Sequence, residues 1–75
     1  MPHVDSSAIE KIDYRLDRNE LFVTFTSGRK YVYFDVPAVI HRHFLDADSF
    51  GRYFNANIRD HYDFRELSQA ALRKA

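Results

Sequence analysis

The sequence contains no cysteine, no net charge and no long hydrophobic run. The lack of cysteine excludes disulfide bonds and thiolate metal sites. A small domain without disulfides is typical of the reducing cytoplasm, where we expect this protein. The first residues have neither a basic start nor an apolar stretch, so we expect no signal peptide, no transmembrane helix and no membrane partner.

Positive and negative charges balance, with eleven Lys and Arg against eleven Asp and Glu. Nucleic-acid-binding domains are usually basic, so any such binding here requires a local patch. A chain of 75 residues forms one small domain, 1–75, and we expect a folded core at about 8–67 with flexible ends at 1–7 and 68–75. Seven Phe and five Tyr enlarge the core, because each aromatic ring buries a large area.

Aromatic and β-branched residues are concentrated in segment 21–33, LFVTFTSGRKYVY, which predicts a β-hairpin turning at Gly28. If Gly28 is the left-handed residue of a three-residue loop, Val23 faces Tyr31. A two-residue loop would instead set Val23 opposite Val32. We favour the three-residue loop, because it puts the larger apolar set on one face of the sheet. That set is Leu21, Val23, Phe25, Tyr31 and Tyr33.

The pattern changes from period two to helical spacing at Pro37, which predicts an α+β fold. A three-stranded antiparallel sheet is followed by two short helices packed on one face, in the order β-β-β-α-α. Charges on Glu10, Lys11 and Asp13 favour an edge position for the first strand, and Ser49 is a suitable N-cap for the second helix. The expected strands are 8–14, 21–26 and 29–34, and the expected helices are 37–46 and 50–59.

Apolar residues at strand and helix spacing define the expected core. The residues expected to be largely buried are Ile12, Leu21, Val23, Phe25, Tyr33, Ile40, Phe44, Phe54 and Ile58. The last stretch of the chain contains three further apolar residues, Tyr62, Phe64 and Leu67. We expect these to pack back onto the domain.

Short motifs occur in a fixed order over about residues 8–67. They are Ile9-x-x-Ile12-x-Tyr14, Leu21-x-Val23-x-Phe25-x-Ser27-Gly28, Tyr31-x-Tyr33, Asp35-Val36-Pro37, Ser49-Phe50-Gly51-Arg52-Tyr53-Phe54-Asn55 and Ile58-Arg59. In this series the chain resembles the KTSC domain, which is named after the C-terminal extension of some lysyl-tRNA synthetases and also occurs as a stand-alone bacterial protein. The resemblance implies RNA binding. The length matches the stand-alone form, so we expect no synthetase catalytic domain.

Two interpretations remain open for Tyr31 and Tyr33, which share one face of a strand. Exposed tyrosines can stack on the bases of single-stranded RNA. Buried tyrosines would instead be core residues beneath the two helices. The core interpretation is favoured, because in the preferred register both tyrosines share a face with aliphatic residues.

Arg52, Asn55 and Arg59 are spaced to form one stripe of the second helix. Two guanidinium groups and an amide in line suit phosphate or carboxylate binding. The alternative is a solvated face with internal ion pairs, such as Arg59 with Asp63 or Asp46. With the hairpin tip and two tyrosines added, the candidate RNA-binding residues are Arg29, Lys30, Tyr31, Arg52, Tyr53, Asn55 and Arg59.

The other face of the sheet remains uncovered if both helices pack on one side. It carries Phe22, Thr24, Lys30, Val32 and Phe34. This face can be a protein-partner surface, a homodimer interface or a stacking platform, or merely a partly exposed face with scattered apolar residues. The function that competes with RNA binding is therefore a protein-interaction or homodimerisation module.

No constellation for catalysis or metal binding is visible. His41 and His43 lie about 200° apart on a helix, so they cannot chelate one metal from that helix alone. No nucleophile–base pair, glycine-rich phosphate loop or paired-carboxylate motif occurs. We therefore expect a protein that is not an enzyme and that has no metal and no cofactor.

Overall fold

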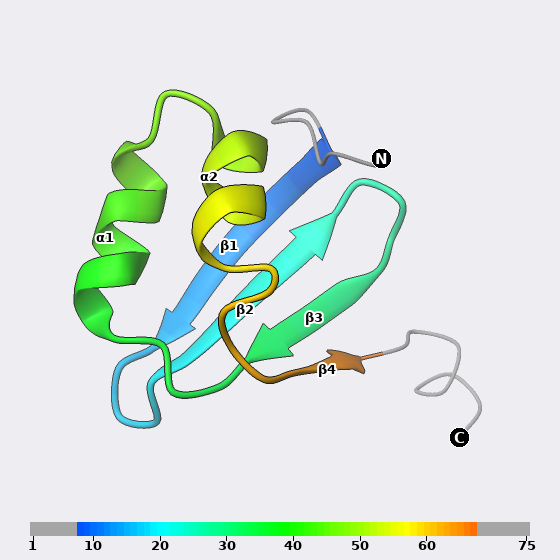
Figure 1. Ribbon diagram of the computed structural model, residues 1–75. Helices are drawn as coiled ribbons and strands as arrows, with labels where there is room; N and C mark the ends of the chain where they lie inside the picture. The colour runs from blue at the N-terminus through cyan, green and yellow to red at the C-terminus, as the bar shows by residue number, and fades with distance from the viewer. Residues whose placement is uncertain (1–7, 68–75) are drawn as a thin grey trace, which may run out of the picture.

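The computed structural model describes residues 8–67, so the flexible ends predicted at 1–7 and 68–75 lie outside the described residues. Four strands form one antiparallel sheet in the order β1-β2-β3-β4, and two helices cover one of its faces (Figure 1). The elements are β1 (Ile9–Arg15), β2 (Glu20–Phe25), β3 (Lys30–Tyr33), α1 (Ala38–Asp46), α2 (Phe50–Asn57) and β4 (Phe64–Leu67). The α+β class is confirmed, and none of the described helices is long and apolar enough to cross a membrane.

The predicted number of three strands is wrong, because β4 pairs with β3 and extends the sheet. In this pairing Phe64 lies opposite Tyr33, and Leu67 lies opposite Lys30. Phe64 and Leu67 are three positions apart, so they point to opposite faces, and the segment shows no apolar alternation. Its side chains are mostly exposed. Pairing with β3, which the local sequence does not encode, makes this segment a strand.

The hairpin of β2 and β3 adopts the favoured register, with Val23 opposite Tyr31 and Leu21 opposite Tyr33. Phe25 N–H donates to the Arg29 carbonyl over 2.8 Å, which closes the three-residue loop. Gly28 has a φ of +98°, a value that residues with a Cβ rarely adopt. The single-face set of five apolar residues predicted from the sequence is therefore confirmed.

A β-bulge interrupts β1 at Glu10, because Ile9 pairs with Phe25 while Lys11 pairs with Thr24. Ile9 and Ile12 are three positions apart, and a regular strand would point them to opposite faces. The extra residue in the bulge turns both toward the helices. The bulge accounts for the x-x spacing of the Ile9-x-x-Ile12 motif. As expected from its charges, β1 lies at an edge of the sheet.

Helix α2 begins as predicted and ends earlier than predicted. The Oγ of Ser49 accepts a hydrogen bond from the Arg52 N–H over 3.2 Å, so Ser49 is the N-cap. The helix stops at Asn57, because Ile58 adopts a φ of −120°. Arg59 therefore lies in the turn after the helix, and the expectation of a helix to residue 59 is wrong.

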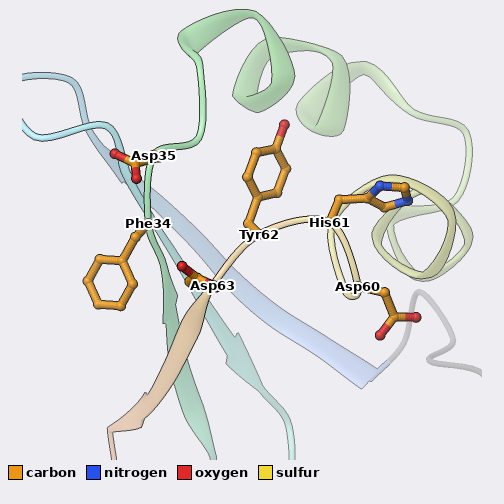
Figure 2. Close-up of a pocket in the computed structure, with 6 residues that line it drawn as sticks. All are labelled: Phe34, Asp35, Asp60, His61, Tyr62 and Asp63. Carbon is orange, nitrogen blue, oxygen red and sulfur yellow. The ribbon is translucent and has the colours of Figure 1, made fainter.

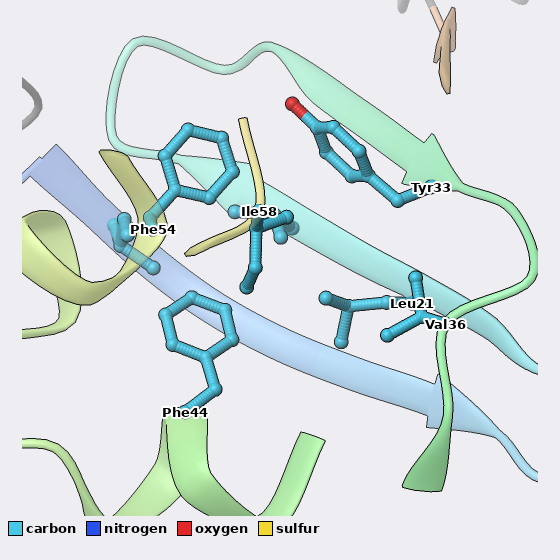
Figure 3. Packing of buried hydrophobic residues seen from close by; sticks show 8 residues of the cluster. Leu21, Tyr33, Val36, Phe44, Phe54 and Ile58 are labelled. Atoms are coloured by element: carbon cyan, nitrogen blue, oxygen red, sulfur yellow. The ribbon is translucent and has the colours of Figure 1, made fainter. Parts of the chain in front are cut away.

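Eight buried residues form one core (Figure 3). They come from β1, β2, β3, the link from β3 to α1, both helices and the turn after α2. They are Ile9, Leu21, Val23, Tyr33, Val36, Phe44, Phe54 and Ile58. Six of the nine expected core residues belong to this cluster. The other three, Ile12, Phe25 and Ile40, are partly buried and pack against the border of this cluster. They lie at the edges of the helix layer, where solvent reaches the side chains.

Two hydrogen bonds hold the link from β3 to α1 against β1 and the turn between β1 and β2. The hydroxyl of Tyr14 donates to the Val36 carbonyl over 2.6 Å, and the Val36 N–H donates to the Asn19 carbonyl over 2.9 Å. Asp35 has a φ of +57°, which Asp tolerates better than most residues with a Cβ. Together these features turn the chain sharply at Asp35 and start α1 over β1.

Candidate nucleic-acid interface

The two helices cover only part of the sheet face on which they lie. Figure 1 shows α1 and α2 over the β1 side, with β3 and β4 extending beyond α2. On the covered side Leu21 and Val23 have no exposed surface. On the uncovered side Tyr31 is half-buried and Phe64 is 54% exposed. Aromatic side chains are therefore presented to solvent on β3 and β4, on the same face as the core.

Tyr31 and Phe64 form what we call the aromatic shelf. Their ring centroids lie 5.8 Å apart. The ring of Tyr33 packs against both, with its centroid 5.5 Å from that of Phe64 and 6.4 Å from that of Tyr31. Tyr33 is itself almost fully buried. Phe25 packs edge-on against Tyr31 at 5.6 Å. Rings held by neighbouring rings lose little conformational freedom on binding, which suits a stacking surface.

Guanidinium groups flank this shelf. A side-chain hydrogen bond with Tyr31 is the main cause of the raised pKa of Arg29, and the charge of Glu66 adds to it. Arg29 Nε lies 3.8 Å from Glu66 Oε2 in an exposed ion pair. Burial is the main cause of the raised pKa of Tyr33, which the positive charge of Arg59 partly offsets. Arg29 therefore lies beside Tyr31, and the charge of Arg59 is close enough to act on the hydroxyl of Tyr33.

The structure brings together some of the seven candidate site residues and separates others. Arg29 and Tyr31 lie at the shelf, and Arg59 lies near Tyr33. Lys30 points to the opposite face of the sheet, because successive side chains of a strand alternate. Of the tyrosines that the sequence left open, Tyr33 is core, as favoured, and Tyr31 lies at the border between core and surface.

The candidates on α2 divide between two sides of the helix. Arg52 is exposed and Asn55 is half-buried, and they lie about 60° apart on one side. Tyr53 is about 200° from Asn55 and stacks on Phe44 of α1 at 5.6 Å. Burial raises the pKa of Tyr53. Tyr53 therefore packs between the helices, on the other side of α2 from Arg52 and Asn55.

The ion pairs proposed as an alternative role for Arg59 do not form. Among residues 8–67, the three ion pairs join Lys11 to Asp13, Arg15 to Asp17 and Arg29 to Glu66. Arg59 is exposed and takes part in none of them. Its guanidinium is thus available to an anionic ligand. Phe64 is the shelf residue that sequence reasoning missed, and a single Phe between charged residues carries no periodic signal that would have identified it.

An open hollow of about 300 Å³ lies between the start of the β3–α1 link and the segment after α2 (Figure 2). It is lined by Phe34, Asp35, Asp60, His61, Tyr62 and Asp63. Figure 2 shows that these side chains diverge, with Tyr62 pointing toward the helices and Phe34 away from them. The described part of the chain has no group of three or more His, Cys, Asp or Glu side chains placed to hold a metal. We assign no ligand to this hollow.

Comparisons with known proteins agree with this architecture. Residues 5–62 match the model of the KTSC domain. A solved structure of a KTSC domain protein from Yersinia pestis superposes with a TM-score of 0.76 at 29% identity, covering 91% of this chain and 92% of the other. The fold of the described residues is therefore shared with that protein.

Three relatives match by sequence. A protein of Tsukamurella paurometabola is 36% identical over 62 residues, with 83% of this chain and 92% of the relative covered. An uncharacterized protein of Stutzerimonas stutzeri is 36% identical over 62 residues, with 81% and 87% covered. A lysine–tRNA ligase of Nostoc punctiforme is 33% identical over 64 residues, which are 85% of this chain and only 11% of the ligase. From these matches and the model at residues 5–62, the chain belongs to the KTSC domain family.

Proposed function

We propose that this domain is a non-catalytic module that binds single-stranded RNA on the aromatic shelf. The observation that carries the proposal is the exposed ring of Phe64 held beside Tyr31, with the guanidinium groups of Arg29 and Arg59 close by. A related domain forms 11% of a lysine–tRNA ligase, a protein named for an RNA substrate, which supports the same ligand class.

The shelf supplies the sequence-independent part of such binding. Stacking of a base on an exposed aromatic ring contributes about 1–3 kcal/mol. Phosphates would be contacted by Arg29, Arg59 and, from the helix, Arg52. The ion pair of Arg29 with Glu66 is exposed to solvent and contributes little, so a phosphate can displace the carboxylate. Because the chain has no net charge, we expect modest affinity and binding confined to this side.

The first experiment measures fluorescence anisotropy of a labelled uridine decamer near 50 mM salt, where the electrostatic part of RNA binding is strong. Phe64→Ala should weaken binding about 5- to 150-fold, the equivalent of one lost stacking contact. Leu45→Ala, at a residue of α1 that is 47% exposed, is the matched control and should leave the affinity unchanged. Absence of RNA binding by the wild-type protein at this salt concentration would refute the proposal.

A second measurement separates phosphate contacts from stacking. Replacing both Arg52 and Arg59 with alanine should weaken binding to every RNA sequence and lower the slope of log K against log[salt] by about 1.4, because each phosphate contact with a single strand contributes about 0.7. Arg42→Ala removes an exposed guanidinium from α1 and should leave the slope unchanged. An unchanged slope in the double variant would remove these two residues from the interface.

A further inference from the structure

The face of the sheet opposite the helices, here called the open face, contains an apolar centre between charged edges. Phe22 of β2 lies directly opposite Val32 of β3, and Val32 is only 5% exposed. Outside this pair, Asp13 of β1 lies opposite Phe22, and Arg65 of β4 lies opposite Val32. One row across the sheet therefore reads acid, aromatic, aliphatic, base.

The neighbouring row has a base at the β1 edge and an acid at the β4 edge, but Glu20 and Phe34 lie between them. Arg15 pairs with Glu20 at the β1 edge. At the β4 edge the Phe34 N–H donates to the Asp63 carbonyl over 2.9 Å. Figure 2 shows Phe34 and Asp63 pointing to the side of the sheet away from Tyr62, which is the open face. This row begins with a base at β1 and ends with an acid beside β4.

These two rows are complementary to themselves. If a second copy lies against the open face and is related by a two-fold axis parallel to the strands, β1 of one copy lies over β4 of the other, and β2 lies over β3. Asp13 then faces Arg65 of the second copy, and Arg15 faces Asp63 of the second copy. Phe22, which is half-buried, lies over Val32 of the second copy, whose side chain is already almost fully covered within its own chain. Every charge in these rows except that of Glu20 meets its opposite.

From this pattern we propose that the open face is a homodimer interface formed by two copies of this chain packed sheet on sheet. In such an isologous interface each contact occurs twice, so the two rows supply four interchain ion pairs around two aromatic–aliphatic contacts. Aligned sheets pack about 10 Å apart with their strands within about 30°, which keeps the rows in register at the centre of the face.

The size of the face sets the expected strength of the dimer. Four strands span about 19 Å, and six residues of a strand span about 20 Å. The projected area is thus about 400 Å², half of the roughly 800 Å² per partner in a standard interface. Because an interface of this size lies below the standard one, we expect a weak dimer. The shelf lies on the opposite side of the sheet, so the dimer does not cover the proposed RNA site.

The proposal is tested by sedimentation equilibrium of the full chain without RNA, from about 10 µM to 1 mM. The wild-type mass should rise from the monomer value of 8.9 kDa toward twice that value. Arg65→Asp puts two carboxylates face to face at two places in the dimer and should weaken association at least about tenfold. Asp13→Arg should do the same.

The decisive variant combines Asp13→Arg with Arg65→Asp, which restores the opposite charges in exchanged positions. It should recover the wild-type dissociation constant to within about threefold. Arg42→Asp makes the same charge change on the exposed side of α1 and should have no effect on association. A wild-type protein that stays at 8.9 kDa up to about 1 mM, or a double variant no better than the single ones, overturns the proposal.

Discussion

The helix-facing side of the sheet has two halves. Both carry apolar side chains, but one half is enclosed by the helices and the other is exposed to solvent. Leu21 and Val23 on β2 are fully enclosed by the helices. Phe64 on β4 has the larger apolar side chain and yet leaves 54% of its surface in solvent. Both halves follow the same strand alternation. Whether an aromatic ring stabilises the fold or can meet a ligand therefore depends on the reach of the helix layer.

The boundary between the two halves runs between Tyr31 and Tyr33. These residues are two positions apart on the same face of β3. Tyr33 lies under Phe54 of α2, with ring centroids 5.6 Å apart, and is 3% exposed. Tyr31 is half-buried and packs against Phe25 and Phe64, which lie on β2 and β4.

The largest effect is expected from removing the aromatic ring that covers the enclosed half. Phe54→Ala should lower the free energy of unfolding by about 3–5 kcal/mol, because a buried ring is lost and a cavity remains. That loss is a large fraction of the roughly 5–15 kcal/mol that stabilises a typical domain. Phe64→Ala removes the same kind of ring from the exposed half of the helix-facing side and should lower the free energy of unfolding by less than about 1 kcal/mol. Urea unfolding of both variants measures the contrast, and equal costs would abolish the distinction between the halves.

A smaller effect is expected where α1 is tied to the enclosed half. Tyr14→Phe removes the hydroxyl that donates to the Val36 carbonyl and keeps the ring that stacks on His41 at 4.6 Å. We expect a loss of about 1 kcal/mol in the free energy of unfolding, the usual net contribution of such a hydrogen bond. Thermal unfolding provides the measurement, with the exposed Val39→Ala on α1 as control. Equal melting temperatures for wild-type protein and Tyr14→Phe would contradict the anchoring role.

The smallest effect concerns pH. Burial against Tyr14 lowers the pKa of His41 below its ordinary value of 6.5, so the folded state binds a proton less readily than the unfolded state. The stability linked to His41 is therefore fully present above about pH 6.5 and is lost as the pH falls from there toward the folded pKa. His41→Phe keeps a ring on Tyr14 and should flatten the stability profile in that window. A profile that keeps its full wild-type slope would assign the pH dependence to other groups.

Local patterns in the sequence predicted the parts of the fold that depend on residues close together in the chain. The hairpin register followed from counting apolar residues on each face, and the left-handed Gly28 agrees with it. The cap at Ser49 and the edge position of β1 followed from residue chemistry. The bulge at Glu10 was not predictable in this way, since a bulge shifts the alternation on which such counting depends.

The candidate site was predicted less well than the fold, for a related reason. Arg29 and Tyr31 were named correctly as neighbours at the hairpin, because they are close in sequence. Tyr53 was a candidate stacking residue, but it stacks on Phe44 of α1 instead of facing the shelf. Phe64 reaches the shelf because β4 pairs with β3, although both helices separate the two strands along the chain. Contacts of that range have no local signature, and they are the ones that form this surface.

The position of β4 also has a consequence for local unfolding. The strands β1, β2 and β3 are joined by short turns, whereas β4 reaches β3 only after both helices have been traversed. It is a four-residue edge strand with mostly exposed side chains, so it belongs to the elements that detach at low free-energy cost while the rest stays folded. Each such opening carries Phe64 away from Tyr31 and removes the shelf. A ligand bound there would hold the strand closed and slow the exchange of its amide hydrogens with solvent.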